Sequence, residues 1–291
     1  TLAAELVTQK PSDPEAFIRE RFSDTKEALF RSEDSLALFV VPLCPLSLTA
    51  QLASAFAKPQ LPCSVNITEL GDGGVAGCAG SSEIPLPTEF TQCSPFSRVP
   101  ALSHNGLGVV ETGCLVRYLC GKSGDTGGAP LRQRVRIEVA FETVLNHFMP
   151  EIINAVNERV FASRRHQRPP DSIAIQAAAT KFRGHLQHLQ DIPSATSCYF
   201  AESVWLIGTS VSIADVVLAA AVFSMHHVVG YDCVTGLDKL QRWWSMVQSE
   251  PWYVEGTRSS FSFAGKLFGS RQKKRDQKGE REVNQVRGHS F

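Results

Sequence analysis

The hydrophobic pattern of the chain changes once, at a Gly-rich segment over residues 121–130. Before this segment, short apolar runs alternate with helical patterns. After it, apolar residues recur only at helical spacing, over about residues 131–163, 171–190, 213–229 and 237–248. We therefore predict a small α/β domain over residues 35–120, a flexible linker over 121–130 and an all-helical domain over 131–258.

The first part of the chain predicts the order β-α-β-loop-β-β-α. Residues 36–41 form a continuous apolar run that suits a strand buried on both faces, and Pro42 ends it. The Gly-, Ser- and Pro-rich residues 71–87 predict a loop. The other elements are predicted as a helix over 46–57, strands over 64–70, 99–103 and 108–110, and a helix over 112–120.

Charge is balanced overall, at 29 basic and 29 acidic residues, but it is unevenly distributed. Residues 1–34 carry a net charge of −3, residues 35–265 carry −2, and residues 266–291 carry +5. This excludes a protein that is basic throughout. It predicts an acidic N-terminal extension over 1–34 and a basic, disordered tail over 259–291. The tail either contacts RNA phosphates or an acidic partner, or is only a solvated linker.

The cysteines and the most apolar segment indicate the cellular compartment of the protein. Eight cysteines occur without any Cys-x-x-Cys spacing, which favours reduced thiols in a cytoplasmic protein and no metal site. The N-terminal residues lack the pattern of a signal peptide. The most apolar run, residues 213–229, contains Asp215, His226 and His227, so it predicts a buried helix and no membrane contact.

A helix-capping motif begins that apolar segment. Ser212 and Asp215 have the spacing of a capping box, in which the two side chains satisfy main-chain N–H groups at a helix start. We expect Asp215 to organise the fold and to do no chemistry.

Two separated motifs resemble the glutathione S-transferase superfamily. The first comprises Glu89-Phe90, residues 94–102 (SPFSRVPAL) and Glu111-Thr112, and the second comprises Ile207-Gly208, residues 212–215 (SIAD) and Arg242-Trp243-Trp244 before Pro251. The resemblance covers about residues 35–258. It implies a thioredoxin-like domain that binds glutathione as co-substrate, an all-α domain and a homodimer or related heteromer.

The first motif implies a glutathione site. A cis Pro100 would turn the main chain of Val99 outward to pair with an extended peptide, whereas a trans proline would simply begin a strand. By resemblance, Glu111 and Thr112 would hold the γ-glutamyl end at a helix N-terminus, although Thr112 would also suit a plain N-cap. Arg98 would meet the glycyl carboxylate.

The resemblance places the catalytic residue after the first strand, at Cys44-Pro45-Leu46-Ser47. Cys44 there is similar to the nucleophile of cysteine-type members such as the omega class, and a helix N-terminus would lower the pKa of its thiol. The alternatives are a Ser47 hydroxyl that donates to a glutathione thiolate, or a Cys44 that is only a small turn residue. A disulfide or small electrophile would be the second substrate, in a pocket that includes His147 and Phe148.

A second hypothesis is that the chain is a non-catalytic interaction module and not an enzyme. The same fold resembles the interaction modules of elongation factor 1 gamma and of aminoacyl-tRNA synthetases in the translation machinery. Ser97-Arg98 replaces the Gly-Lys of the superfamily pattern, and the loop over 71–87 is long for this fold. Both departures weaken the hypothesis that the chain is an enzyme. The basic tail favours the hypothesis that it assembles protein complexes.

Overall fold

The computed structural model describes residues 34–70, 86–121, 130–162, 167–192, 199–201 and 203–265. The predictions for the acidic extension over 1–33, for most of the loop over 71–87, for the linker and for the basic residues 266–291 lie outside the described residues.

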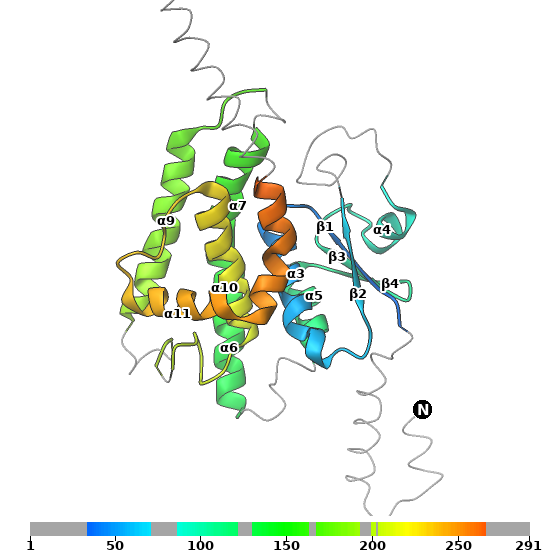
Figure 1. The fold of residues 1–291 in the computed structure, drawn as a ribbon, viewed down its shortest axis with the longest axis horizontal. Coiled ribbons are helices and arrows are strands. Elements are labelled where there is room, and N and C mark those ends of the chain that lie inside the picture. The colour runs from blue at the N-terminus through cyan, green and yellow to red at the C-terminus, as the bar shows by residue number, and fades with distance from the viewer. Residues whose placement is uncertain are drawn as a thin grey trace, which may run out of the picture.

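A four-stranded mixed sheet forms the centre of the first domain (Figure 1). Its strand order is β2-β1-β3-β4, with β1 and β2 parallel and the other neighbours antiparallel. Every residue of β1 is buried, as its unbroken apolar sequence predicts. The strands are β1 (Leu36–Val40), β2 (Val65–Glu69), β3 (Ala101–His104) and β4 (Leu107–Val110).

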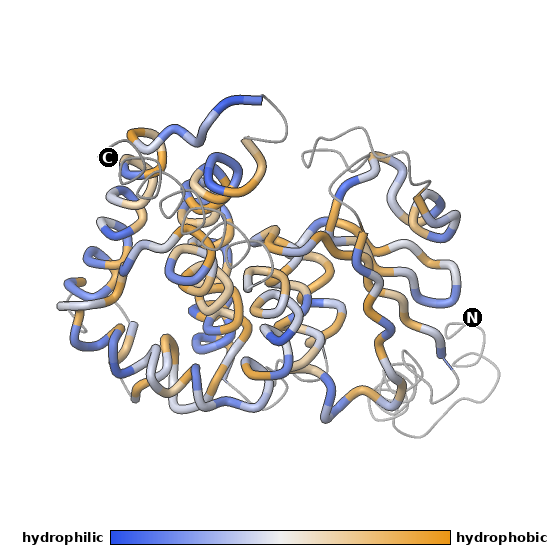
Figure 2. Tube along the Cα trace, turned by 45° about the horizontal axis from the view of Figure 1, so that its top comes forward, coloured by the Kyte–Doolittle hydropathy of each residue, from blue (hydrophilic) through white to orange (hydrophobic). Residues whose placement is uncertain are grey.

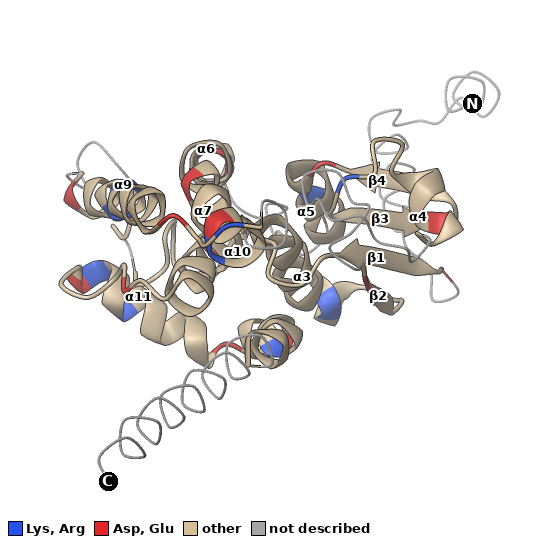
Figure 3. Cartoon of the chain, turned by 90° about the horizontal axis from the view of Figure 1, so that it is seen from above, with Lys and Arg blue, Asp and Glu red and all other residues tan. Residues whose placement is uncertain are grey.

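Helices cover both faces of this sheet (Figure 3). Helices α3 (Pro45–Ala57) and α5 (Thr112–Cys120) pack against each other on one face, and α4 (Thr88–Cys93) packs against β3 and β4 on the other. A Cβ atom at Gly108 would lie 2.5 Å from the Cys93 carbonyl oxygen, so only glycine permits this approach. The arrangement confirms the predicted thioredoxin-like domain. A short 3₁₀ helix, η1 (Lys58–Gln60), follows α3.

The second domain is all-helical, as predicted. Its helices include three π-helical turns, each continuous with an α-helix. The elements are α6 (Leu131–Thr143), η2 (Val144–Phe148), α7 (Met149–Val156), η3 (Asn157–Phe161), α9 (Ser172–Asp191), α10 (Ile213–Phe223), η4 (Ser224–Val229) and α11 (Asp238–Ser249).

Helix α10 lies at the centre of the hydrophobic core. All of its residues are buried, and it packs against α6 of its own domain and against α3 of the first domain. Figure 2 shows hydrophobic residues concentrated in the strands and in the central helices. No helix among the described residues is long and apolar enough to cross a membrane.

Asp215 forms hydrogen bonds with three segments of the chain at the start of α10. Its Oδ2 atom accepts hydrogen bonds from the main-chain N–H and the hydroxyl of Ser212, each 2.9 Å long. The bond from the Ser212 N–H, together with the Ser212 side chain that accepts from the Asp215 N–H, forms the capping box. Its Oδ1 atom accepts from the Leu206 N–H and the Trp243 indole N–H, also at 2.9 Å. Burial raises the pKa of the Asp215 carboxyl, and these hydrogen bonds act in the opposite direction.

Residues 251–265 form a further helix, which corrects the predicted start of the tail at residue 259. Its buried positions include Thr257, Ser260 and Ala264. These small or polar side chains do not give an apolar periodicity, so the sequence pattern fades although the helix continues. The 251–265 helix packs on α3, where Gln51 Nε2 donates to Ser259 Oγ over 3.2 Å.

The crossing of these two helices depends on Gly256. A Cβ atom there would lie 2.9 Å from Leu52 Cδ2 and 3.0 Å from Leu52 Cα, so alanine must push the helices apart. We expect Gly256→Ala to lower the free energy of unfolding by about 1–2 kcal/mol. Gly184 in α9 has open space around it, so Gly184→Ala should instead raise stability by up to about 1 kcal/mol. Urea denaturation of both variants checks this, and changes of equal sign would contradict it.

Candidate functional site

A small pocket forms where α3, the loop before β3 and α5 begin. Its volume is about 100 Å³, and its lining includes five predicted binding residues, Arg98, Val99, Pro100, Glu111 and Thr112. The other lining residues are Leu46, Ser94, Pro95, Phe96 and Val110. The fold therefore brings together residues that lie up to 66 positions apart in the sequence.

The Val99–Pro100 peptide bond is cis, as the sequence motif predicts. The β1–β3–β4 ladder begins at Ala101, which pairs with Phe39 and Val110. Val99 therefore precedes the ladder by two residues and lies at the pocket. This is the position from which main-chain groups can pair with an extended peptide.

Ser94 holds the loop that carries Arg98. The Ser94 hydroxyl is buried, accepts a hydrogen bond from the Arg98 N–H at 3.0 Å and donates to the Arg98 carbonyl at 2.9 Å. The Arg98 side chain is exposed at the pocket. Sequence reasoning gave Ser94 no role, although a serine that precedes a proline in a loop is a signal for a side-chain-stabilised turn.

Three non-glycine residues with positive φ lie in or next to the segments that form the pocket. They are Leu43 (φ 64°), Ser97 (φ 50°) and Glu111 (φ 66°), which are half of the six described non-glycine residues with positive φ. Such residues cost about 1–3 kcal/mol each, and they persist where the surroundings impose them. Leu43 precedes Cys44 and Ser97 precedes Arg98, so the strain is concentrated at the predicted site residues.

Cys44 and Ser47 have different surroundings in the turn after β1. Cys44 is the half-buried N-cap residue of α3, two positions before the pocket residue Leu46. Ser47 is fully buried, and its hydroxyl accepts a hydrogen bond from the Val41 N–H at 3.1 Å. The structure therefore gives Ser47 a role in fixing the turn and does not favour it as a donor to a substrate thiolate.

The start of α5 supplies the polar end of the pocket. Glu111 is the exposed N-cap residue of α5, and Thr112 is the first helical residue and is buried. Thr112 is therefore not the N-cap, which was the alternative explanation for this residue. The first N–H groups of α5 and its dipole favour a carboxylate here.

His147 and Phe148 do not lie at this pocket. Phe148 is buried and stacks on His185 of α9, with ring centroids 5.0 Å apart and planes at 8°. His147 is exposed. Their place in a second-substrate pocket, which the resemblance implied, stays a prediction. Leu145 instead faces α5, since its Cδ2 atom lies 3.3 Å from where a Gly113 Cβ would be.

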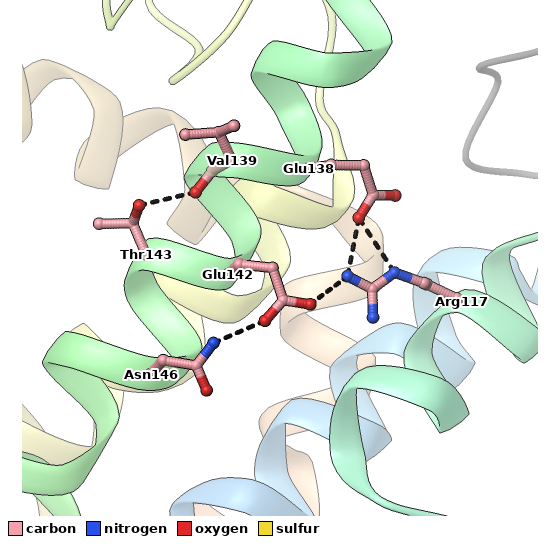
Figure 4. A network of polar contacts seen from close by, with 6 residues as sticks. All are labelled: Arg117, Glu138, Val139, Glu142, Thr143 and Asn146. Carbon is pink, nitrogen blue, oxygen red and sulfur yellow. Dashed lines mark hydrogen bonds and ion pairs between the residues drawn. The ribbon is translucent and has the colours of Figure 1, made fainter.

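Arg117 links α5 to α6 of the helical domain (Figure 4). Its guanidinium donates to Glu138 Oε2 over 2.7 Å and 3.0 Å, and it also contacts Glu142. It lies 4.8 Å from the ring centre of Phe141. The Arg117 hydrogen bond lowers the pKa of the Glu142 carboxyl. This network fixes how α5 sits against α6.

Comparison with known proteins identifies the fold. Residues 178–251 match the family model of the glutathione S-transferase C-terminal domain. No curated protein sequence matches the chain. Human glutathione S-transferase T1-1 is similar in structure, with a TM-score of 0.59 and 20% identity over 80% of this chain and 88% of that one.

Two further solved structures are similar. Glutathione transferase F7 from Populus trichocarpa has a TM-score of 0.59 and 18% identity, over 77% of this chain and 99% of that one. The theta-class glutathione S-transferase from Xanthomonas axonopodis pv. citri, solved with glutathione bound, has a TM-score of 0.58 and 17% identity over 76% and 96%. The chain therefore belongs to the fold class in which a thioredoxin-like domain is joined to an all-helical domain. The chain has the glutathione S-transferase fold, and its residues 178–251 match the model of that family's C-terminal domain.

Proposed function

We propose that the protein binds glutathione in the pocket at the start of α5 and uses it in a thiol-transfer or related transferase reaction. The observation that carries the proposal is the junction of a cis Val99–Pro100 bond with the N-terminus of α5 in one pocket. A γ-glutamyl tripeptide needs two features in its binding site. Main-chain groups must pair with its peptide backbone, and the positive end of a helix must bind its carboxylate.

The lining residues give each part of glutathione a partner. The γ-glutamyl carboxylate would accept from the first N–H groups of α5, and Glu111 would pair with its ammonium group. The cysteinyl main chain would pair with Val99. The exposed Arg98 would meet the glycyl carboxylate. Because the pocket measures only about 100 Å³, it would enclose the γ-glutamyl end alone, and the rest of the tripeptide would lie across the surface.

Cys44 would be the nucleophile of the reaction. Its thiolate would attack the glutathione sulfur of a mixed disulfide, so that the mixed disulfide bond breaks and a Cys44–glutathione disulfide forms. The other thiol would leave as a thiolate and take a proton from water. A second glutathione thiolate would then attack the Cys44–glutathione disulfide, which releases oxidised glutathione and regenerates Cys44.

Retention on glutathione-agarose tests the binding. We expect the full chain to be retained and to elute with free glutathione, and we expect Glu111→Ala to lose retention because it removes the partner of the ammonium group. Glu89→Ala is the matched control, since Glu89 is an exposed carboxylate of α4 that does not line the pocket. Failure of the unmodified chain to bind would contradict the proposal.

An exposed apolar stripe on α6 supports self-association. Leu131, Val135 and Val139 are 67%, 52% and 54% exposed, and their spacing of four residues places them on one helix face. Exposed aliphatic residues in a row are typical of a protein contact. We propose that this stripe is buried between two copies of the chain, which is the surface that either an enzyme dimer or an assembly module would use.

Substitution in the stripe tests this contact. We expect light scattering after size-exclusion chromatography to give a dimer for the full chain and a monomer for Val135→Asp, because a buried unpaired charge disfavours the contact. Ile173→Asp is the control, since Ile173 in α9 is 81% exposed and lies outside the stripe. A monomeric unmodified chain, or equal dissociation of both variants, would contradict the assignment.

The translation-associated alternative has a separate test. A pull-down with the full chain and with a chain lacking residues 266–291 should recover synthetases or elongation factors if the chain is an assembly module. Recovery of these partners without glutathione retention would favour that alternative over the enzyme.

A further inference from the structure

A second, larger pocket lies toward the other end of α3. Its volume is about 520 Å³, and it is bounded by α3, by β2 with the residues that lead into it, and by the 251–265 helix. It shares no lining residue with the candidate glutathione pocket. Its volume falls within the range of about 300–1,000 Å³ that is usual for small-molecule sites.

Small side chains leave this space unfilled. The α3 wall contains Ser54 and Ala55, and the helix wall contains Gly256 and Ser259. Gly256 brings the two helices into close contact at their crossing, as the Leu52 distances show. Beside that crossing, the short side chains cannot fill the gap between the helices and the sheet. The gap opens to solvent, because lining residues such as Lys58 and Arg258 are exposed, so a ligand can enter it from the surface.

The strand side of the pocket is apolar. Leu61, Val65 and Ile67 line it, and Ile67 is 47% exposed. Burial raises the pKa of the Cys63 thiol, so this lining residue is also uncharged at neutral pH. An aliphatic body placed against this wall would be removed from water, at about 25 cal/mol per Å² of apolar area buried.

One cation at the pocket, Arg258, has no counter-ion among the residues that the structure describes. Lys58 Nζ pairs with Glu255 Oε1 at 2.6 Å, so these two charges satisfy each other. Arg258 lines the pocket from the 251–265 helix and forms no ion pair with any described residue. Glu69 lines the strand side, also without an ion pair to a described residue. Figure 3 shows charged residues on the 251–265 helix and at the end of α3.

We propose that this pocket binds an elongated apolar molecule with one carboxylate head group. The head would pair with Arg258, whose planar guanidinium can bind a carboxylate with two hydrogen bonds. The apolar body would lie against Leu61, Val65 and Ile67. Glu69 would repel a carboxylate, so it sets the orientation of the ligand with its head toward the helix. The site is independent of glutathione binding.

Calorimetric titration of the full chain with dodecanoate, below its micelle concentration, tests the proposal. We expect saturable binding of one molecule per chain. Ser259→Trp and Ser262→Trp place an indole in the pocket and should weaken binding by about tenfold or more. Val254→Trp is the matched control, since Val254 is 52% exposed on the same helix and does not line the pocket. It should leave the affinity within about twofold.

The charge variants test the head-group assignment. Arg258→Ala should weaken dodecanoate binding by about tenfold and leave binding of the neutral dodecanol unchanged. Glu69→Gln should not weaken dodecanoate binding. Absence of saturable binding by the unmodified chain, equal effects of the Ser262→Trp and Val254→Trp variants, or an Arg258→Ala effect that is the same for both probes would overturn the proposal. Glutathione-agarose retention of the same variants should be unchanged, so failure of this site and failure of the proposed function are distinguishable.

Discussion

Replacement of Asp215 by alanine is expected to lower the free energy of unfolding by about 3–5 kcal/mol. The substitution removes the acceptor for four hydrogen bonds, from the Leu206 N–H, the Trp243 indole and two groups of Ser212. Asp215 is fully buried, so water cannot replace the lost acceptor without opening the core. Urea denaturation followed by tryptophan fluorescence measures the change.

Ser212→Ala is the matched comparison for that effect. It removes the hydroxyl that accepts from the Asp215 N–H in the capping box and donates to Asp215 Oδ2. It leaves the contacts of Asp215 with Leu206 and Trp243 in place, so it should cost about 1 kcal/mol. Asp215→Asn should fall between the two, because its amide group presents a donor where the carboxylate accepted from Ser212. Equal losses for Asp215→Ala and Ser212→Ala would show that Asp215 acts only as a cap.

Replacement of Cys44 by serine is expected to lower thiol-transfer activity on the order of a thousandfold or more. Serine keeps the size of the side chain, but its hydroxyl is not ionised near neutral pH and cannot form the mixed disulfide. Serine is also a favoured N-cap residue, so α3 should keep its stability. The rate of reduction of a mixed disulfide between glutathione and a small thiol, with glutathione in excess, measures the effect.

Cys114→Ser controls for the loss of a thiol as such. Cys114 is an exposed free cysteine within α5, away from the turn after β1 that holds Cys44, so its replacement should leave the rate unchanged. Full activity in Cys44→Ser would remove the thiolate mechanism and leave glutathione binding without a nucleophile from this turn.

The sequence predicted the elements of the fold where local pattern decides the structure. The continuous apolar run before Pro42 became β1, buried on both faces. The apolar segment with Asp215 became the buried helix α10, and the Val-Pro motif became a cis peptide bond at the start of β3. In each case, the signal lies within a few residues of the feature that it predicts.

The sequence did not predict features that depend on packing between elements or on the exact geometry of a turn. The helical residues 259–265 are held by contacts with α3 and have no apolar period of their own. The stacking of Phe148 on His185 joins η2 to α9, and the sequence gives no sign of this contact. The structural role of Ser47 depends on the Val41 N–H six residues earlier. The larger pocket arises from two helices whose crossing no local pattern reveals.

Calorimetric titration with reduced glutathione tests the central claim most directly. The full chain should bind one molecule of glutathione. Thr112→Val, which keeps the shape of the side chain and removes its hydroxyl, should weaken binding by about tenfold. Glu111→Ala should weaken it at least as much, and Glu89→Ala should leave it unchanged. Absence of saturable binding by the unmodified chain, or equal affinity in Glu111→Ala and Glu89→Ala, would contradict a glutathione site at the start of α5.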